Sequence, residues 1–165
     1  MCSEDVAALA RWERHPDPAF RNYDIGPLTP KQAAELWEAF CDPAGRRRPF
    51  VAMLGERIVG HVVLREIDHV AGTAEVGIML DPGVIGRGLG RRILRQFAGD
   101  CAQRGFRRLT LEVLASNERA LRAYRAAGFV AFGERFGPPA PGAPPARIIQ
   151  METDLPPQPF RESNS

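Results

Sequence analysis

The chain has 165 residues, of which 44% are hydrophobic and 25% are charged, and its formal net charge is +2 at pH 7. This length and composition are typical of one globular domain with a buried core, and they exclude a disordered chain. Acidic residues are interleaved with the arginines, so no basic stripe for a nucleic-acid partner emerges. No apolar run approaches the length of a membrane span, and we expect a cytoplasmic protein with no membrane partner.

The first quarter of the chain is expected to hold an extension and the first two elements of a domain. Residues 1–19 form the extension, with a short helix around residues 6–13. A strand is expected at residues 20–25. Thr29 is a good N-cap and Pro30 suits the first helical position, which predicts a helix to about residue 40.

Alternating apolar residues and turn signals predict three strands in the middle of the chain. Residues 50–54 and 58–65 form an antiparallel pair across a tight turn, and residues 73–80 form the next strand. An amphipathic helix then begins near Leu89, and Gly105 is its C-terminal cap.

The remaining elements complete an α/β pattern. A half-buried strand is expected at residues 109–113 and a helix at residues 117–127. Two further strands follow at residues 129–136 and 148–153, with a proline-rich loop at residues 137–145 between them. This order predicts a mixed, mostly antiparallel sheet flanked by helices. We assign residues 20–155 to this domain and residues 156–165 to a flexible C-terminal tail.

Cysteines and histidines give no indication of a metal site. Cys2, Cys41 and Cys101 are widely spaced and lack the paired spacing of a zinc or redox motif. Cys101 falls at a helical core spacing, so we interpret it as a packed thiol. His61 and His69 are isolated, which favours a surface or core role over catalysis. The arginines of residues 46–48 are interpreted as a solvated loop cluster, and attraction of an anionic ligand is the alternative.

A glycine-dense turn follows the strand at residues 73–80 and opens directly into the amphipathic helix. The turn reads Ile85, Gly86, Arg87, Gly88, Leu89, Gly90 and Arg91. Such a turn presents unpaired backbone N–H groups at the positive end of the helix dipole, where they bind phosphate. A Walker A loop is excluded because no lysine lies nearby, and a Rossmann fingerprint is excluded because Arg91 stands where its third glycine belongs.

The turn instead resembles the CoA pyrophosphate loop of GNAT acetyltransferases, in which Gly-x-Gly follows an antiparallel strand. Residues 111–129 resemble the second motif of that family, with Asn117, Ala120 and Tyr124 on one helical face before Gly128. Element order agrees over residues 20–155, and the specific motif matches lie within residues 75–129. The family usually has Gln or Arg where this chain has Ile85, a departure that bears on CoA affinity.

The resemblance implies an acetyl-CoA-dependent N-acetyltransferase with a GNAT-like fold. Its acceptor would be a primary amine of a small molecule or of a peptide or protein N-terminus. Family members often form homodimers, so a homodimer is one expectation for the assembly. A noncatalytic acyl-CoA-binding or regulatory module on the same fold is the alternative, although such a module could discard the tyrosine and the strand carboxylate that this chain keeps.

Two segments are expected to hold the pantetheine arm of CoA. If the strand at 73–80 splays from the strand at 109–113, the backbone of Ile78, Met79 and Leu80 is free to pair with the arm as an added strand does. Asn117 would then hydrogen-bond the amides of the arm. The alternative for Asn117 is a simple N-cap.

Two residues are candidates for proton transfer. The resemblance implies that Tyr124 protonates the departing thiolate and that Glu75 accepts the proton of the amine. Glu75 lies about 10 Å from the backbone of Ile78 along the strand, and Gly77 on the same face is expected to leave space for substrate or water. The alternatives are a packed aromatic for Tyr124 and an arginine-paired surface carboxylate for Glu75.

Overall fold

The computed structural model describes residues 1–15, 26, 28–40, 44–139 and 142–156. The predicted strand at residues 20–25 lies outside the described residues, as does the predicted tail except for residue 156. The division into an extension, a domain and a tail therefore stays a prediction.

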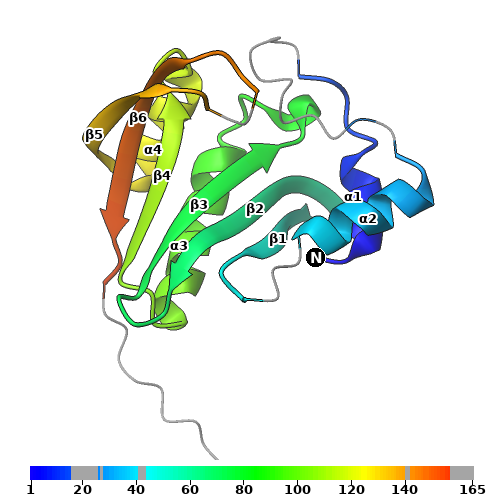
Figure 1. Cartoon of the computed structure of the whole chain (residues 1–165), viewed down its shortest axis with the longest axis horizontal. Helices are drawn as coiled ribbons and strands as arrows, with labels where there is room; N and C mark the ends of the chain where they lie inside the picture. Colours follow the sequence, from blue (N-terminus) through cyan, green and yellow to red (C-terminus); the bar gives the residue numbers. More distant parts are fainter. Residues whose placement is uncertain (16–25, 27, 41–43, 140–141, 157–165) are drawn as a thin grey trace, which may run out of the picture.

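Within the described chain, one mixed sheet holds six strands in the order β1-β2-β3-β4-β6-β5 (Figure 1). All neighbours are antiparallel except β3 and β4, which are parallel. The strands are β1 (Arg48–Leu54), β2 (Arg57–Asp68), β3 (Thr73–Leu80), β4 (Arg108–Leu114), β5 (Val130–Gly137) and β6 (Ala146–Asp154). The predicted mixed, mostly antiparallel sheet is confirmed.

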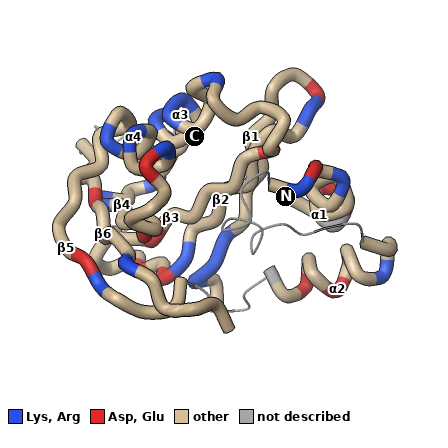
Figure 2. The backbone as a smooth tube through the Cα atoms, turned by 90° about the horizontal axis from the view of Figure 1, so that it is seen from above, with Lys and Arg blue, Asp and Glu red and all other residues tan. Residues whose placement is uncertain are grey.

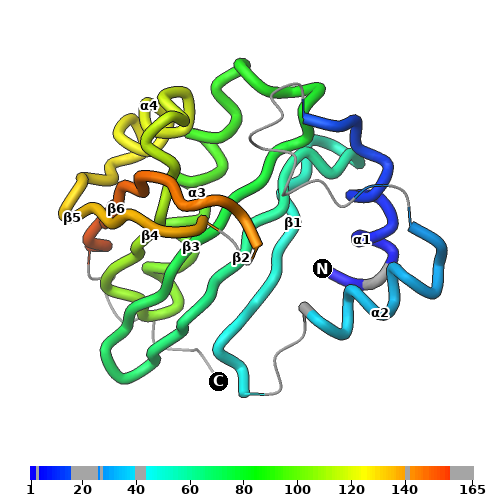
Figure 3. Tube along the Cα trace, turned by 45° about the horizontal axis from the view of Figure 1, so that its top comes forward, coloured from blue at the N-terminus to red at the C-terminus, as the bar shows by residue number. Residues whose placement is uncertain are grey.

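Helices flank this sheet at two places. The helices are α1 (Ser3–Leu9), α2 (Pro30–Phe40), α3 (Leu89–Gln103) and α4 (Glu118–Ala127), with a 3₁₀ turn η2 at Pro82–Val84. Figure 3 shows α1 and α2 beside the β1 end of the sheet, and in Figure 1 α3 and α4 lie behind the strands. Helices α3 and α4 therefore cover one face of the sheet.

Local sequence explains where the helices begin. Thr29 Oγ1 accepts a hydrogen bond from the Gln32 N–H at 3.3 Å, and the Gln32 side chain accepts one from the Thr29 N–H at 2.9 Å, so the predicted cap is confirmed as a reciprocal box. Helix α1 begins before the predicted residues 6–13, because the Asp5 carboxylate accepts a hydrogen bond from the Cys2 N–H at 2.6 Å. The sequence analysis missed this cap.

Strand β2 is longer than predicted for a local reason. The expected strand ended at Arg65, but Glu66 takes a positive φ of 47° at an irregularity in the β2–β3 register, and pairing resumes beyond it. Asp68 then closes the strand, since its Oδ1 accepts from the N–H groups of Val70 and Ala71 at 2.8 and 2.9 Å.

The core lies between the sheet and helices α3 and α4. Its fully buried side chains include Leu64 of β2, Leu109 of β4 and Met151 of β6, packed with Leu94 and Cys101 of α3. Burial raises the pKa of the Cys101 thiol to about 11, so this cysteine stays protonated at neutral pH. The interpretation of Cys101 as a packed thiol is confirmed.

Strands β3 and β4 separate after a short parallel ladder. They pair at Thr73–Arg108, Ala74–Leu109 and Glu75–Thr110, and no further pair joins these two described strands. Strand β3 continues to Leu80 and stays paired with β2 throughout that stretch. The predicted splay is confirmed, and it leaves the β4-facing edge of β3 without a partner strand from about Val76 onward (Figure 1).

Candidate active site

A cavity of about 1050 Å³ opens where β3 and β4 separate. Strand β3, the glycine turn, the end of β4 and helix α4 all contribute to its lining. It brings together nearly all the residues singled out from the sequence: Glu75, Ile78, Met79, Leu80, Ile85, Gly86, Gly88, Leu89, Gly90, Arg91, Asn117 and Tyr124. Arg87 is the exception, since it is exposed and is not among the described lining residues.

The buried carboxylate of Asp81 fixes the position of the glycine turn. Asp81 is 3% exposed, and its side chain accepts a hydrogen bond from the Gly83 N–H at 2.8 Å and forms an ion pair with Arg57 at 2.5 Å. Arg57 begins β2, so this pair ties the turn after β3 to the neighbouring strand. The turn is therefore ordered by the protein itself before any ligand binds.

The glycines of the turn serve two different purposes. Gly86 and Gly88 have φ values of 85° and 74°, a left-handed conformation that other residues rarely adopt, and a Cβ at either position would meet nothing within 4 Å. A Cβ at Gly90 would instead lie 3.2 Å from Leu80 Cδ1, so Gly90 lets α3 pack against β3. Gly88 is the N-cap of α3 and lacks a side chain to satisfy the first-turn N–H groups, which leaves them for an anion.

Basic residues gather on the two helices beside the turn. Figure 2 shows basic residues, all of them arginines, along α3 and α4. Of these residues, Arg91 on α3 and Arg119 and Arg122 on α4 line the cavity. This surface suits a ligand with several phosphate charges.

Helix α4 presents Asn117 and Tyr124 to the cavity. Asn117 Oδ1 accepts a hydrogen bond from the Ala120 N–H at 3.1 Å, so the N-cap role is confirmed, and the amide NH₂ is the part left to donate to a ligand. Tyr124 is half-buried against the core, with its ring centroid 6.3 Å from that of Phe129. Both residues thus have a structural role and still line the cavity.

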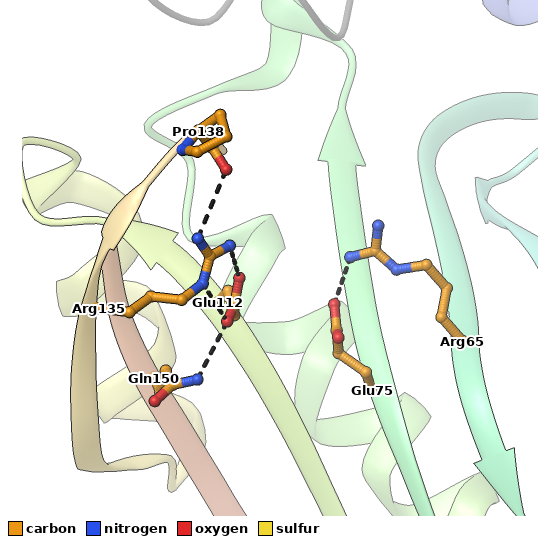
Figure 4. Close-up of polar contacts among 6 residues, drawn as sticks. All are labelled: Arg65, Glu75, Glu112, Arg135, Pro138 and Gln150. Carbon is orange, nitrogen blue, oxygen red and sulfur yellow. Dashed lines mark hydrogen bonds and ion pairs between the residues drawn. The ribbon is translucent and has the colours of Figure 1, made fainter. Parts of the chain in front are cut away.

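Glu75 lies on the face of β3 that points away from α3 and α4. Its Oε1 accepts a hydrogen bond from Arg65 Nη2 at 2.6 Å (Figure 4). The side chain of Glu75 is 27% exposed and that of Arg65 is 45% exposed. Glu75 is therefore paired with an arginine, as the interpretation of a surface carboxylate predicted. The carboxylate also lines the cavity, which the other interpretation requires.

Gly77 does not leave open space beside Glu75, so that expectation was wrong. A Cβ on Gly77 would lie 3.0 Å from Val63 Cγ1 and 3.4 Å from Arg65 Nη2. The closer of these contacts is with Val63, the register partner of Gly77 on β2, and the Arg65 guanidinium lies beside it. Periodicity placed Glu75 and Gly77 on one face correctly, but it carried no information about the side chain that crosses from β2.

Glu112 is a cavity-lining carboxylate that the sequence analysis did not single out. It accepts hydrogen bonds from Arg135 Nε at 2.9 Å and Nη2 at 2.5 Å, and from Gln150 Nε2 at 3.1 Å (Figure 4). The hydrogen bonds from Arg135 hold the pKa of Glu112 below its usual value. The signal that could have found it was the alternation along β4, which puts Glu112 opposite the core residues Leu111 and Val113.

His61 is buried on β2 next to the cavity. Burial, together with the charge of Arg47, lowers its pKa to about 4, so the imidazole is neutral at pH 7. Its register partner is Met79 of β3. Arg47, interpreted from the sequence as solvated, lines the same cavity, so the structure places part of that basic cluster at the site.

The N-terminal segment contributes a further wall of the cavity. Trp12, Glu13 and Arg14 line it, and His15 Nε2 lies 3.1 Å from Arg119 Nη2 on α4. Among the described residues, no group of three or more acidic, histidine or cysteine side chains is placed to hold a metal ion. In the same part of the chain, no helix is long and apolar enough to cross a membrane.

The fold is an α/β sheet with a cavity where its two central strands separate, lined in part by a glycine turn at the start of a helix. The chain belongs to the Acetyltransferase (GNAT) family, whose pattern matches residues 7–129. It is accordingly an acyltransferase, and its fold is that of the N-acetyltransferases. A search of curated proteins finds no match to the chain.

Solved structures of N-acetyltransferases share the fold. A chimera of the spermidine N-acetyltransferase from Vibrio cholerae is 19% identical, with a TM-score of 0.73 over 93% of this chain and 89% of that one. The ribosomal-protein-S5-alanine acetyltransferase from Vibrio fischeri is 19% identical, with a TM-score of 0.72 over 94% and 90%. The V. cholerae spermidine enzyme in complex with CoA and spermine is 21% identical, with a TM-score of 0.67 over 78% and 76%.

Proposed function

We propose that the protein transfers the acetyl group of acetyl-CoA directly to a primary amine of a small molecule or of a peptide or protein N-terminus. The observation that carries this proposal is the unpartnered edge of β3 directly beside the glycine turn. An extended pantetheine arm fits such an edge, and the pyrophosphate fits the N–H groups at the start of α3. A structural neighbour in complex with CoA supports this choice of cosubstrate.

The cosubstrate would contact three parts of the cavity. The turn at residues 85–91, of which all but Arg87 line the cavity, would hold the pyrophosphate. The backbone of Ile78, Met79 and Leu80 would pair with the arm, and the Asn117 amide would donate to it. The thioester would then lie beside Ile78. A cytoplasmic location and a homodimer stay predictions of the sequence.

The reaction needs three proton transfers. Glu75 takes a proton from the acceptor ammonium through one bridging water, and the free amine attacks the thioester carbonyl carbon. The new C–N bond forms, the nitrogen loses a second proton to water, and the C–S bond breaks while the Tyr124 hydroxyl protonates the departing thiolate. The products are the N-acetylated amine and CoA; Glu75 releases its proton to solvent and Tyr124 regains one, so that one proton is released per turnover.

A thermal-shift experiment tests the binding step. Acetyl-CoA should stabilise the protein by about 2.7 kcal/mol at 100 times Kd, because it binds only the folded state. The variant Gly88→Val should lose this stabilisation, since valine is strained at the left-handed N-cap and would crowd the phosphate. Wild-type protein that shows no shift at saturating acetyl-CoA would refute the assignment.

The matched control is Gly55→Val in the β1–β2 turn. Gly55 also has a positive φ, 61°, and an added Cβ would meet nothing within 4 Å, but the residue does not line the cavity. Both variants should therefore pay a similar backbone cost in the absence of ligand. Only Gly88→Val should lose the response to acetyl-CoA.

A further inference from the structure

Arg65 lines the cavity beside the part of β3 against which the proposed thioester lies. It crosses from β2 over Gly77, with Nη2 placed 3.4 Å from where a Cβ on that glycine would be. Gly77 directly precedes Ile78, beside which the proposed thioester lies, and one residue of strand is about 3.3 Å. A fixed positive charge therefore stands within a few ångströms of the attacking amine.

Most of the hydrogen-bonding capacity of Arg65 is unused within the described chain. An arginine side chain has five N–H donors. Nη2 donates to Glu75 at 2.6 Å, and the described residues accept no other hydrogen bond from this guanidinium. The side chain is 45% exposed and lines the cavity, so its other donors are accessible to a ligand there.

Of the three described glutamates that line the cavity, Glu13 lies on the N-terminal segment, and the two on the central strands are ion-paired. Glu75 is paired with Arg65, and Glu112 with Arg135. A second ammonium group on the acceptor would have to compete with an arginine for either carboxylate. Coulomb repulsion from Arg65 would act against it as well.

We infer that the acceptor is a primary amine that carries a carboxylate close to the amine, and that Arg65 binds this carboxylate. The inference rests on the proposed function and specifies its acceptor. An arginine and a carboxylate form strong, directional hydrogen bonds, so one contact fixes the amine in front of the thioester. Two sources supply this chemistry: a free amino acid, and a peptide whose first residue is acidic.

An acetylation assay with four pools of acceptor amines distinguishes these two sources from each other and from amines that lack a carboxylate. The first contains the free amino acids, and the second contains the corresponding amino-acid amides, which keep the side chains and lose the α-carboxylate. The third contains C-terminally amidated peptides that begin with Asp or Glu, and the fourth contains polyamines. Acetylated products are quantified by mass spectrometry with acetyl-CoA present at saturation.

One of the two carboxylate pools should be acetylated roughly 10- to 100-fold faster than the amide and polyamine pools, as expected for a charge-assisted hydrogen bond. For free amino acids the comparison is with the amide pool. For acidic peptides it is with the same peptides beginning with Asn or Gln. Equal or faster acetylation of amides or polyamines overturns the inference.

Variants of Arg65 test whether this residue causes the preference for carboxylate-bearing acceptors. Arg65→Ala should reduce the preference for the carboxylate pool to about onefold, and Arg65→Lys should retain part of it, because lysine keeps the charge but loses the forked geometry. Gly77→Ala should weaken the preference less than Arg65→Ala, since its Cβ would crowd Val63 Cγ1 at 3.0 Å and only touch Arg65 Nη2 at 3.4 Å, so the guanidinium stays in place. A preference that survives in Arg65→Ala contradicts the inference.

The matched control is Arg147→Ala. Arg147 is ion-paired with Glu134 and does not line the cavity, so its loss removes one positive charge at a distance from the acceptor. It should keep the full preference. Failure of the inference is distinguishable from failure of the proposed function, because wild-type protein that binds acetyl-CoA yet acetylates neither carboxylate pool refutes only the inference. The absence of any acetyl-CoA thermal shift refutes the proposed function.

Discussion

The two sides of the cavity each carry a glutamate held by an arginine, but they hold it differently. On the β3 side, Glu75 accepts a single hydrogen bond from Arg65 of the neighbouring strand. On the β4 side, Glu112 accepts hydrogen bonds from two nitrogens of Arg135 and from Gln150, and its pKa is lowered. A carboxylate with one partner retains lone pairs for a water or a substrate, whereas one with three donors is fixed as an anion. The β3 side is therefore suited to proton transfer and the β4 side to holding the cavity's shape.

The largest effect should come from exchanging the two glutamates for glutamines. Glu75→Gln should lower kcat/KM at neutral pH by roughly 10²- to 10⁴-fold, because the ammonium acceptor loses its base. The loss should shrink as pH rises and free amine becomes abundant. Glu112→Gln should lower kcat/KM by less than about 10-fold, since its role is structural. Steady-state pH profiles of both variants test the comparison, and the reverse order of effects would assign the base to Glu112.

A smaller effect is expected from Tyr124, which approaches the cavity from α4. Tyr124→Phe should lower kcat by about 10²-fold and leave the KM for acetyl-CoA nearly unchanged, because protonation of the thiolate helps the transition state and not the ground state. The ring contact with Phe129 should persist in phenylalanine. Single-turnover kinetics that show an unchanged chemical step would return Tyr124 to a packing role.

The smallest effect should be on stability, through the β4 side. Arg135→Ala should lower the urea midpoint of unfolding at pH 7, because Glu112 loses two charge-assisted hydrogen bonds at a partly exposed site. The pKa of Glu112 is lowered in the folded protein, so this stabilisation is present above its unfolded value of about 4.5 and is lost as pH falls below it. Urea unfolding at pH 7 and pH 3 measures the difference.

The exposed pair Arg147–Glu134 is the control for that measurement. Both side chains are more than half exposed, so Arg147→Ala should cost less than about 0.5 kcal/mol at either pH. If Arg135→Ala and Arg147→Ala lower the stability to urea equally at pH 7, the hydrogen bonds from Arg135 do not order Glu112.

The sequence predicted those features that are encoded by local pattern. The glycine turn, the caps at Thr29 and Asn117 and the face of Glu75 depend on neighbours a few residues away, and periodicity and capping rules reach that far. The role of Gly77 and the constraint on Glu112 depend on Arg65 and Arg135, which are distant in sequence and become neighbours only through strand register. Sequence spacing does not determine which long arginine side chain crosses to the next strand.

The three-pair ladder between β3 and β4 makes the sheet resemble two panels joined at one corner. Strands β1, β2 and β3 form one panel and β4, β6 and β5 the other, each with a longer internal ladder. An extended ligand in the gap would act as an added strand between the panels. Amide protons along the open edge of β3, near Ile78 and Leu80, should then exchange readily with solvent in the free protein and slowly once the gap is filled. The cosubstrate would serve as a part of the sheet as well as a reactant.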